Sequence, residues 1–199
     1  MQTSLFKTEP LEPQARIPGL TYLPDFVTAT EEKALLEIID AQPWLSDLKR
    51  RVQHYGYKYD YKARAISEEL YLGPLPSWLA EYAERLHSQR LFTEKPDQAI
   101  VNEYHPGQGI SPHIDCVPCF TETIASLSLG SACVMDFARP NTGAKTSMLL
   151  EPRSLIVLTD DARYHWMHAI AARKSDKFDG TVILRARRVS LTFRKTAKH

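Results

Sequence analysis

The chain has 199 residues, of which 43% are hydrophobic and 25% are charged. This length excludes a disulfide-stapled miniprotein and leaves no room for two full-sized domains, so we expect one domain with a fully developed core. The 25 Lys and Arg residues nearly balance the 24 Asp and Glu residues, which excludes a partner chosen by bulk charge alone.

Residues 1–18 contain three prolines and little periodicity, and we expect a loose lead-in before a single domain over residues 19–199. The lead-in lacks the apolar run of a signal peptide. No stretch approaches the roughly 18 apolar residues of a membrane span. Cys116, Cys119 and Cys133 are an odd number without framework spacing, and Cys116-x-x-Cys119 offers at most half a zinc site. We therefore expect a cytoplasmic protein with no disulfide scaffold and no membrane partner.

Two helices are predicted in the N-terminal half. Thr28 and Glu31 fit a capping box ahead of an apolar stripe, and Pro43 ends that helix. A second helix is predicted to start near Pro76, because the apolar residues after it recur at helical spacing.

From residue 98 onward, short runs rich in β-branched and aromatic residues alternate with turn signals. About six such runs at close spacing favour an antiparallel barrel or jelly roll over βαβ units. We expect a mainly β (α+β) fold in which helices of residues 19–97 pack outside a β core of residues 98–195. The runs are AIVNEY, TIASLSLG, CVMDFA, SMLLEPRSLIVL, TVIL and RVSLTFR.

His113-x-Asp115 follows the turn-rich run HPGQGISP. In an extended segment this spacing puts an imidazole and a carboxylate on one face. A second histidine would complete the 2-His-1-carboxylate triad that leaves open positions on Fe(II). His165 and His168 are both available downstream, and the residues alone leave the choice between them open.

Polar and apolar residues alternate strictly over residues 188–194. One interpretation is an exposed strand with a wet face. The other is a strand whose polar face lines a pocket, with Arg188 and Arg194 gripping a dicarboxylate, since a guanidinium binds a carboxylate bidentately and keeps its charge. Asn102 and Tyr104 would add an amide and a phenol on one face of another strand.

In this order, the residues resemble the AlkB family of Fe(II)/2-oxoglutarate dioxygenases over roughly residues 20–195. The runs PGQGISPHID, IASLSLGS, VMDF and RYHWMH are most similar to the branch that includes the AlkB domain of the tRNA wobble-uridine hydroxylase. The resemblance implies a double-stranded β-helix (jelly-roll) core. It also implies Fe(II), 2-oxoglutarate and O2 as cofactor and co-substrates.

The same resemblance implies roles for individual residues. His113, Asp115 and His168 would be the iron ligands, because only His168 fits the family's W-x-His. Members of the family convert 2-oxoglutarate to succinate and carbon dioxide while they hydroxylate a C–H bond. On an N-alkyl group, the hydroxylated product breaks down and releases an aldehyde. Four residues would bind 2-oxoglutarate: Arg188 and Tyr104 at its distal carboxylate, and Arg194 with Asn102 near its metal-binding end.

Residues 49–64 contain six Lys or Arg residues and four tyrosines at alternate positions. An extended chain would present these tyrosines on one face, where aromatic stacking and cations suit a single strand or a flipped-out base. Alternatively, an edge ribbon packs its tyrosines on the core. Because the family's nucleotide-recognition lid lies here, we expect the following substrate-binding residues: Arg51, Tyr55, Tyr57, Tyr59 and Tyr61.

The leading hypothesis is oxidative dealkylation of alkylated bases in single-stranded DNA or RNA, of the repair type, with no obligate protein partner. Hydroxylation of a modified wobble uridine in tRNA is the alternative within the same chemistry. From other classes, a non-catalytic nucleic-acid-binding module and a zinc hydrolase stay open. One departure from the family's repair prototype is Val117, which stands where that enzyme has a second acidic residue.

Overall fold

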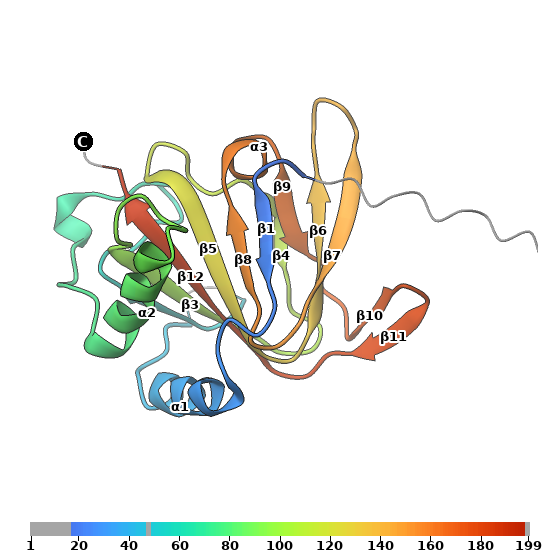
Figure 1. Cartoon of the computed structure of the whole chain (residues 1–199), viewed down its shortest axis with the longest axis horizontal. Helices are drawn as coiled ribbons and strands as arrows, with labels where there is room; N and C mark the ends of the chain where they lie inside the picture. The colour runs from blue at the N-terminus through green and yellow to red at the C-terminus, as the bar shows by residue number, and fades with distance from the viewer. Residues whose placement is uncertain (1–16, 47–48, 198–199) are drawn as a thin grey trace, which may run out of the picture.

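The computed structural model describes residues 17–46 and 49–197, so the predicted lead-in lies outside the described residues up to residue 16. Within the described part the chain is mainly β with few helices (Figure 1). The elements in chain order are β1 (Leu20–Leu23), α1 (Ala29–Asp40), β2 (Val52–Tyr55), a 3-10 helix η1 (Glu68–Leu70), α2 (Ser77–Ser88), β3 (Gln98–Tyr104), β4 (Ile110–His113), β5 (Phe120–Gly130), β6 (Cys133–Ala138), β7 (Lys145–Leu150), β8 (Leu155–Leu158), α3 (Asp160–Tyr164), β9 (Met167–Ile170), β10 (Ser175–Phe178), β11 (Thr181–Leu184) and β12 (Arg188–Thr196).

The strands form two larger antiparallel sheets and one hairpin. The six-stranded sheet has the order β1-β8-β5-β12-β3-β2, the four-stranded sheet has the order β4-β9-β6-β7, and β10 pairs with β11. Figure 1 shows α1 and α2 outside the six-stranded sheet and the β10–β11 hairpin projecting from the other end of the molecule. This arrangement confirms the predicted mainly β, jelly-roll class with N-terminal helices packed outside.

Both predicted helices are present. The capping box at the start of α1 is complete, because the Glu31 amide donates to Thr28 Oγ1 (3.2 Å) and the Thr28 amide donates to Glu31 Oε2 (2.7 Å). Helix α1 ends at Asp40, shortly before Pro43, and α2 begins directly after Pro76. No helix within residues 17–46 and 49–197 is long and apolar enough to cross a membrane.

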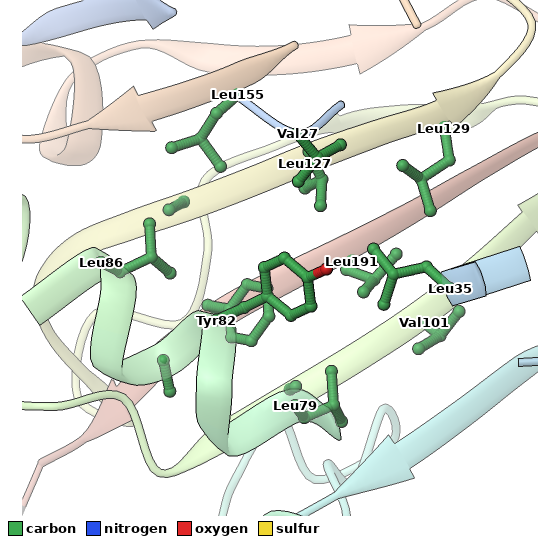
Figure 2. Packing of buried hydrophobic residues seen from close by; sticks show 14 of the residues in the cluster. Val27, Leu35, Leu79, Tyr82, Leu86, Val101, Leu127, Leu129, Leu155 and Leu191 are labelled. Atoms are coloured by element: carbon green, nitrogen blue, oxygen red, sulfur yellow. The ribbon is translucent and has the colours of Figure 1, made fainter. Parts of the chain in front are cut away.

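The two faces of β12 have different environments. Val189, Leu191 and Phe193 are buried in an apolar cluster between the six-stranded sheet and the helices. Figure 2 shows Leu79, Tyr82 and Leu86 of α2 beside Leu191 within this cluster. Burial of such side chains is the main favourable contribution to folding.

The alternating polar residues of β12 face the opposite side of the sheet. Arg188, Ser190 and Thr192 are nevertheless buried. The wet-face interpretation of this strand is therefore wrong, and its polar face lines an interior space.

Glu103 of β3 forms a buried ion-pair cluster outside that interior space. Its carboxylate, on a side chain only 1% exposed, accepts hydrogen bonds from Arg51 Nε (2.6 Å) and Arg187 Nε (2.7 Å). Burial alone would raise the pKa of Glu103, but these two guanidinium groups outweigh burial and lower it from 4.5 to about 2. The carboxylate therefore stabilises the fold fully above pH 4.5, and this contribution is lost as the pH falls toward 2.

Glu103→Gln is expected to reduce the free energy of unfolding at pH 7 by about 2–4 kcal/mol, because it removes the buried carboxylate that pairs with Arg51 and Arg187 and leaves Arg187 with Asp40 alone. The variant should also lose less stability than the wild type between pH 4.5 and pH 2. Urea denaturation at several pH values measures both effects. Asp40→Asn is the control, since Asp40 pairs with Arg187 at a half-exposed position and should cost less than about 1 kcal/mol. Equal losses in the two variants would contradict this account.

Candidate functional site

A cavity of about 830 Å³ lies between the two larger sheets. The polar face of β12 forms part of its wall, together with residues of β3, β4 and β9 and of the segment 49–64. It brings together nine of the twelve residues predicted for the site: Tyr59, Tyr61, Asn102, Tyr104, His113, Asp115, His168, Arg188 and Arg194. The other three, Arg51, Tyr55 and Tyr57, are not part of its lining.

Strand pairing positions the two histidines. His113 at the end of β4 is the direct partner of His168 in β9, and their ring centroids are 4.3 Å apart. Asp115 follows two residues after His113, and its Oδ2 lies 3.5 Å from His168 Nε2. One potential ligand atom from each of the three side chains lies within 4.8 Å of the others. His165 is outside this group and exposed, with Nε2 3.9 Å from Asp161 Oδ1, so the geometry selects His168.

His168, Asp115 and the ring orientation of His113 suit metal binding. Burial lowers the pKa of His168 from 6.5 to about 4, so its imidazole is neutral at physiological pH. His113 Nδ1 lies 2.8 Å from the Ser111 carbonyl oxygen, which accepts an N–H from that nitrogen and leaves Nε2 free as a ligand. Burial would raise the pKa of Asp115, but Arg194 and the two imidazoles hold it well below its usual range. This donor set fits Fe(II) in a 2-His-1-carboxylate site.

Arg188 supplies a buried positive charge that is only partly paired. Its Nη2 donates to Ser128 Oγ at 2.8 Å, whereas Nε and Nη1 have no hydrogen-bond partner among the described residues. A buried cation with unpaired N–H groups is costly until an anion arrives. Tyr104, its direct partner across the β12–β3 ladder, lies with its ring centroid 5.4 Å from the guanidinium carbon. The pair therefore fits one carboxylate of a dicarboxylic acid.

Arg194 lies at the other end of the same strand face and beside the triad. Its Nη2 is ion-paired with Asp115 Oδ1, and its Nη1 donates to Gln98 Oε1 at 3.3 Å. Asn102 lies between the two arginines along the ladder, directly opposite Ser190. The Asn102 Oδ1 accepts from Arg50 Nε at 2.8 Å, which orients its amide in the cavity wall.

The four alternating tyrosines separate into two pairs. Strand β2 ends at Tyr55, and the next residue, Gly56, has a positive φ of 76° that interrupts the extended chain. Tyr55 packs on the core against Trp78, with ring centroids 5.3 Å apart. Tyr57 pairs with Tyr71 outside the cavity lining.

Tyr59 and Tyr61 line the cavity and contact each other edge to face, with ring centroids 5.0 Å apart. Tyr55 therefore packs on the core, as the edge-ribbon alternative expected. Only Tyr59 and Tyr61 face the cavity together, as the base-stacking hypothesis expected of all four tyrosines. The tyrosines alternate without interruption in the sequence over residues 55–61, so the sequence pattern does not show that they fall into two pairs. The extended chain is interrupted by the backbone conformation of Gly56, which only the structure shows.

Three cations of the cavity lining, Lys49, Arg50 and Arg64, were not among the predicted site residues. The predicted Arg51 instead binds Glu103 and lies over the Trp44 ring, 4.8 Å from its centroid. The composition indicates a basic segment but does not say whether Arg50 or Arg51 faces the cavity. In the structure Arg50 lines the cavity and Arg51 points to the other side, toward Glu103.

The structure also contains a bond that the sequence did not predict, a disulfide between Cys116 and Cys119. It links residues three positions apart and is a local closure of the turn after Asp115 rather than a framework. Cys133 is a buried free cysteine.

Comparison with known proteins agrees with this geometry. The family model for the 2OG-Fe(II) oxygenase superfamily matches residues 42–194. The chain is 40% identical over 95% of its length to the "Alkylated DNA repair protein ALKBH8 homolog" of Arabidopsis thaliana. It is 39% identical over 93% of its length to the "tRNA (carboxymethyluridine(34)-5-O)-methyltransferase ALKBH8" of Macaca fascicularis. It spans 61% and 31% of the lengths of these two relatives, respectively.

The solved structure of OsALKBH1 shares the fold, with a TM-score of 0.67 at 16% identity, and the match covers 92% of this chain and 99% of that one. The protein therefore belongs to the 2OG-Fe(II) oxygenase superfamily, and within it to the AlkB family. It is therefore an Fe(II)/2-oxoglutarate oxygenase by family, and the family implies Fe(II), 2-oxoglutarate and O2, with His113, Asp115 and His168 as the candidate metal ligands.

Proposed function

We propose that this oxygenase hydroxylates a modified uridine at the wobble position of tRNA. The carrying observation is the similarity of nearly the whole chain, at 39% identity, to a relative named for carboxymethyluridine at position 34 of tRNA. From the sequence, oxidative dealkylation was the leading hypothesis and hydroxylation of a wobble uridine was the alternative. We now favour the alternative. A cytoplasmic location, where mature tRNA is abundant, stays a prediction.

In this proposal His113, Asp115 and His168 hold the iron, as the neutral His168 imidazole, the ionised Asp115 carboxylate and the close spacing of the three side chains allow. When bound there, Fe(II) with 2-oxoglutarate supplies the activation of O2 that hydroxylates a C–H bond and yields succinate and carbon dioxide. The Ser111 carbonyl fixes the His113 ring for this task. The Arg194 guanidinium keeps Asp115 ionised in its buried position.

The co-substrate is held by the polar face of β12 and its neighbour β3. Arg188 binds the distal carboxylate of 2-oxoglutarate with its two unpaired nitrogens, and the adjacent Tyr104 hydroxyl donates to the same group. Arg194, which is paired with Asp115, and Asn102 would position the other end.

The base enters through the part of the cavity lined by residues 49–64. Tyr59 and Tyr61 provide aromatic faces for a base that has left its stack. Lys49, Arg50 and Arg64 provide cations for the flanking phosphates. This combination suits a single-stranded segment such as an anticodon loop, whose bases are already accessible.

A second candidate is oxidative dealkylation of alkylated bases in DNA or RNA. The name of the Arabidopsis relative favours it. The position two residues after Asp115 favours the uridine proposal, because Val117 is exposed there and supplies no carboxylate for reading a damaged base.

Mass spectrometry of nucleosides separates the two functions. The protein is incubated with Fe(II), ascorbate and 2-oxoglutarate in air, with either total tRNA or methylated single-stranded DNA. A gain of one oxygen on tRNA uridines is the expected result, and it should disappear without 2-oxoglutarate. Loss of methyl groups from the DNA, with tRNA unchanged, would overturn the proposal in favour of dealkylation.

A further inference from the structure

Arg163 of α3 is a buried arginine that no part of the proposed reaction uses. Its side chain is among the largest of those less than 2% exposed. All of its hydrogen bonds go to backbone carbonyl oxygens of residues 115–121: Nη1 donates to Asp115 (2.9 Å), Nη2 to Cys116 (3.2 Å) and Phe120 (3.4 Å), and Nε to Thr121 (3.3 Å).

These carbonyls lie at the two ends of one turn. The turn is closed by the Cys119 amide, which donates to the Cys116 carbonyl at 3.3 Å, and by the disulfide between the same residues. It connects Asp115 to the start of β5. Arg163 therefore connects helix α3 to the main chain at and just after Asp115, one of the potential metal ligands. His168, another potential ligand, follows α3 within a few residues, in β9.

The geometry of a guanidinium explains why an arginine occupies this position. Its planar fork carries five N–H groups in fixed directions and can serve several carbonyls spread along a turn. A lysine ammonium is a single point with three donors. None of the four hydrogen bonds of Arg163 goes to a carboxylate, so burial of this charge is offset by main-chain oxygens.

We propose that Arg163 is a positioning residue of the metal site: it holds the backbone of Asp115 and its turn so that the Asp115 carboxylate faces His168. Arg194 holds the same residue by its carboxylate, so Asp115 is fixed through both its main chain and its side chain. This role rests on the proposed metal ligands but not on the proposed tRNA substrate.

The test compares Arg163→Lys and Arg163→Gln with Arg185→Lys. Arg185 is also a buried arginine, and it binds the Ala171 carbonyl (2.7 Å) beyond the far end of β9 together with the Asp176 carboxylate. Like Arg163 it has a largely buried side chain that donates to main-chain carbonyls, but its charge is paired with a carboxylate and it lies outside the cavity that holds the triad. Fe(II) affinity is measured under argon from the visible charge-transfer band that forms with 2-oxoglutarate, and thermal unfolding is measured without metal.

Both Arg163 variants should bind Fe(II) about 10–100-fold more weakly, the usual loss when a residue that orients a metal ligand is removed. Arg185→Lys should lower the unfolding temperature and keep the wild-type Fe(II) affinity. Wild-type affinity in Arg163→Lys and Arg163→Gln, or an equal loss in Arg185→Lys, would overturn the positioning role. A wild-type protein that binds no Fe(II) would instead overturn the metal site itself, and this outcome is distinguishable from the others.

Discussion

His113→Ala is expected to abolish 2-oxoglutarate-dependent succinate formation. The substitution removes the imidazole that strand pairing aligns with His168 and that the Ser111 carbonyl orients. Loss of residues that only orient a ligand costs about 10–100-fold, so loss of a ligand itself should cost more than about 100-fold. Succinate is measured by mass spectrometry with Fe(II) supplied in excess.

His165→Ala is the matched control for this prediction. His165 belongs to the same sequence run as His168 and was an equal candidate from the residues alone. In the structure it lies at the end of α3, exposed and near Asp161. Its variant should keep wild-type turnover. Turnover that survives in His113→Ala, or is lost in His165→Ala, would remove the proposed triad.

Arg188→Met should abolish 2-oxoglutarate binding without destabilising the protein. Truncating one partner of a buried charge pair costs about 2–5 kcal/mol, so the affinity for 2-oxoglutarate should fall by about 30-fold or more. Among the described residues, however, the Arg188 guanidinium donates one hydrogen bond, to Ser128, and its Nε and Nη1 are buried without a partner. An apolar side chain of similar length should therefore leave the free energy of unfolding equal or raise it by about 1–4 kcal/mol.

Arg185→Met should show the opposite pattern. The Arg185 guanidinium is paired with the fully buried Asp176 carboxylate, so its removal leaves that charge with Arg173 as its remaining cation and lowers stability. It lies outside the cavity lining, and 2-oxoglutarate affinity should be unchanged. Urea denaturation and titration with 2-oxoglutarate in the presence of Fe(II) under argon give both quantities. A loss of stability in Arg188→Met comparable to that in Arg185→Met would show that Arg188 is a structural residue.

The sequence predicted the fold class because the hydrophobic period changes from helical to alternating near residue 98. The structure follows that change in the main, although β1 and β2, which precede residue 98, form the edges of the six-stranded sheet, and the short helix α3 follows it. Strict alternation and short spacing indicated a polar face on β12 and an imidazole and a carboxylate on one face at His113-x-Asp115. That these groups belong to one site came from the resemblance, because the residues alone left an exposed strand open. The pairing of His113 with His168 depends on strand register and was available only from the resemblance.

Other parts of the site depend on contacts between distant segments. Arg50 faces the cavity and Arg51 faces Glu103, a difference that the composition of a basic run does not contain. Arg163 gave no signal in the sequence, because its partners are main-chain carbonyls about 45 positions earlier. The break at Gly56 separated tyrosines that an uninterrupted strand would have kept together.

The two-faced character of β12 has a consequence for how this protein tolerates change. Its odd-numbered residues, such as Leu191, complete the core against α2, and its even-numbered residues, such as Arg188, form the floor of the cavity. Insertion or deletion of one residue within the strand would exchange the two sets, burying charges in the core and placing apolar groups beneath the co-substrate. A point substitution changes one face of the strand and leaves the other intact, whereas an inserted or deleted residue changes both faces at once. Residues of this strand can therefore be substituted during evolution, but the length of the strand must stay the same.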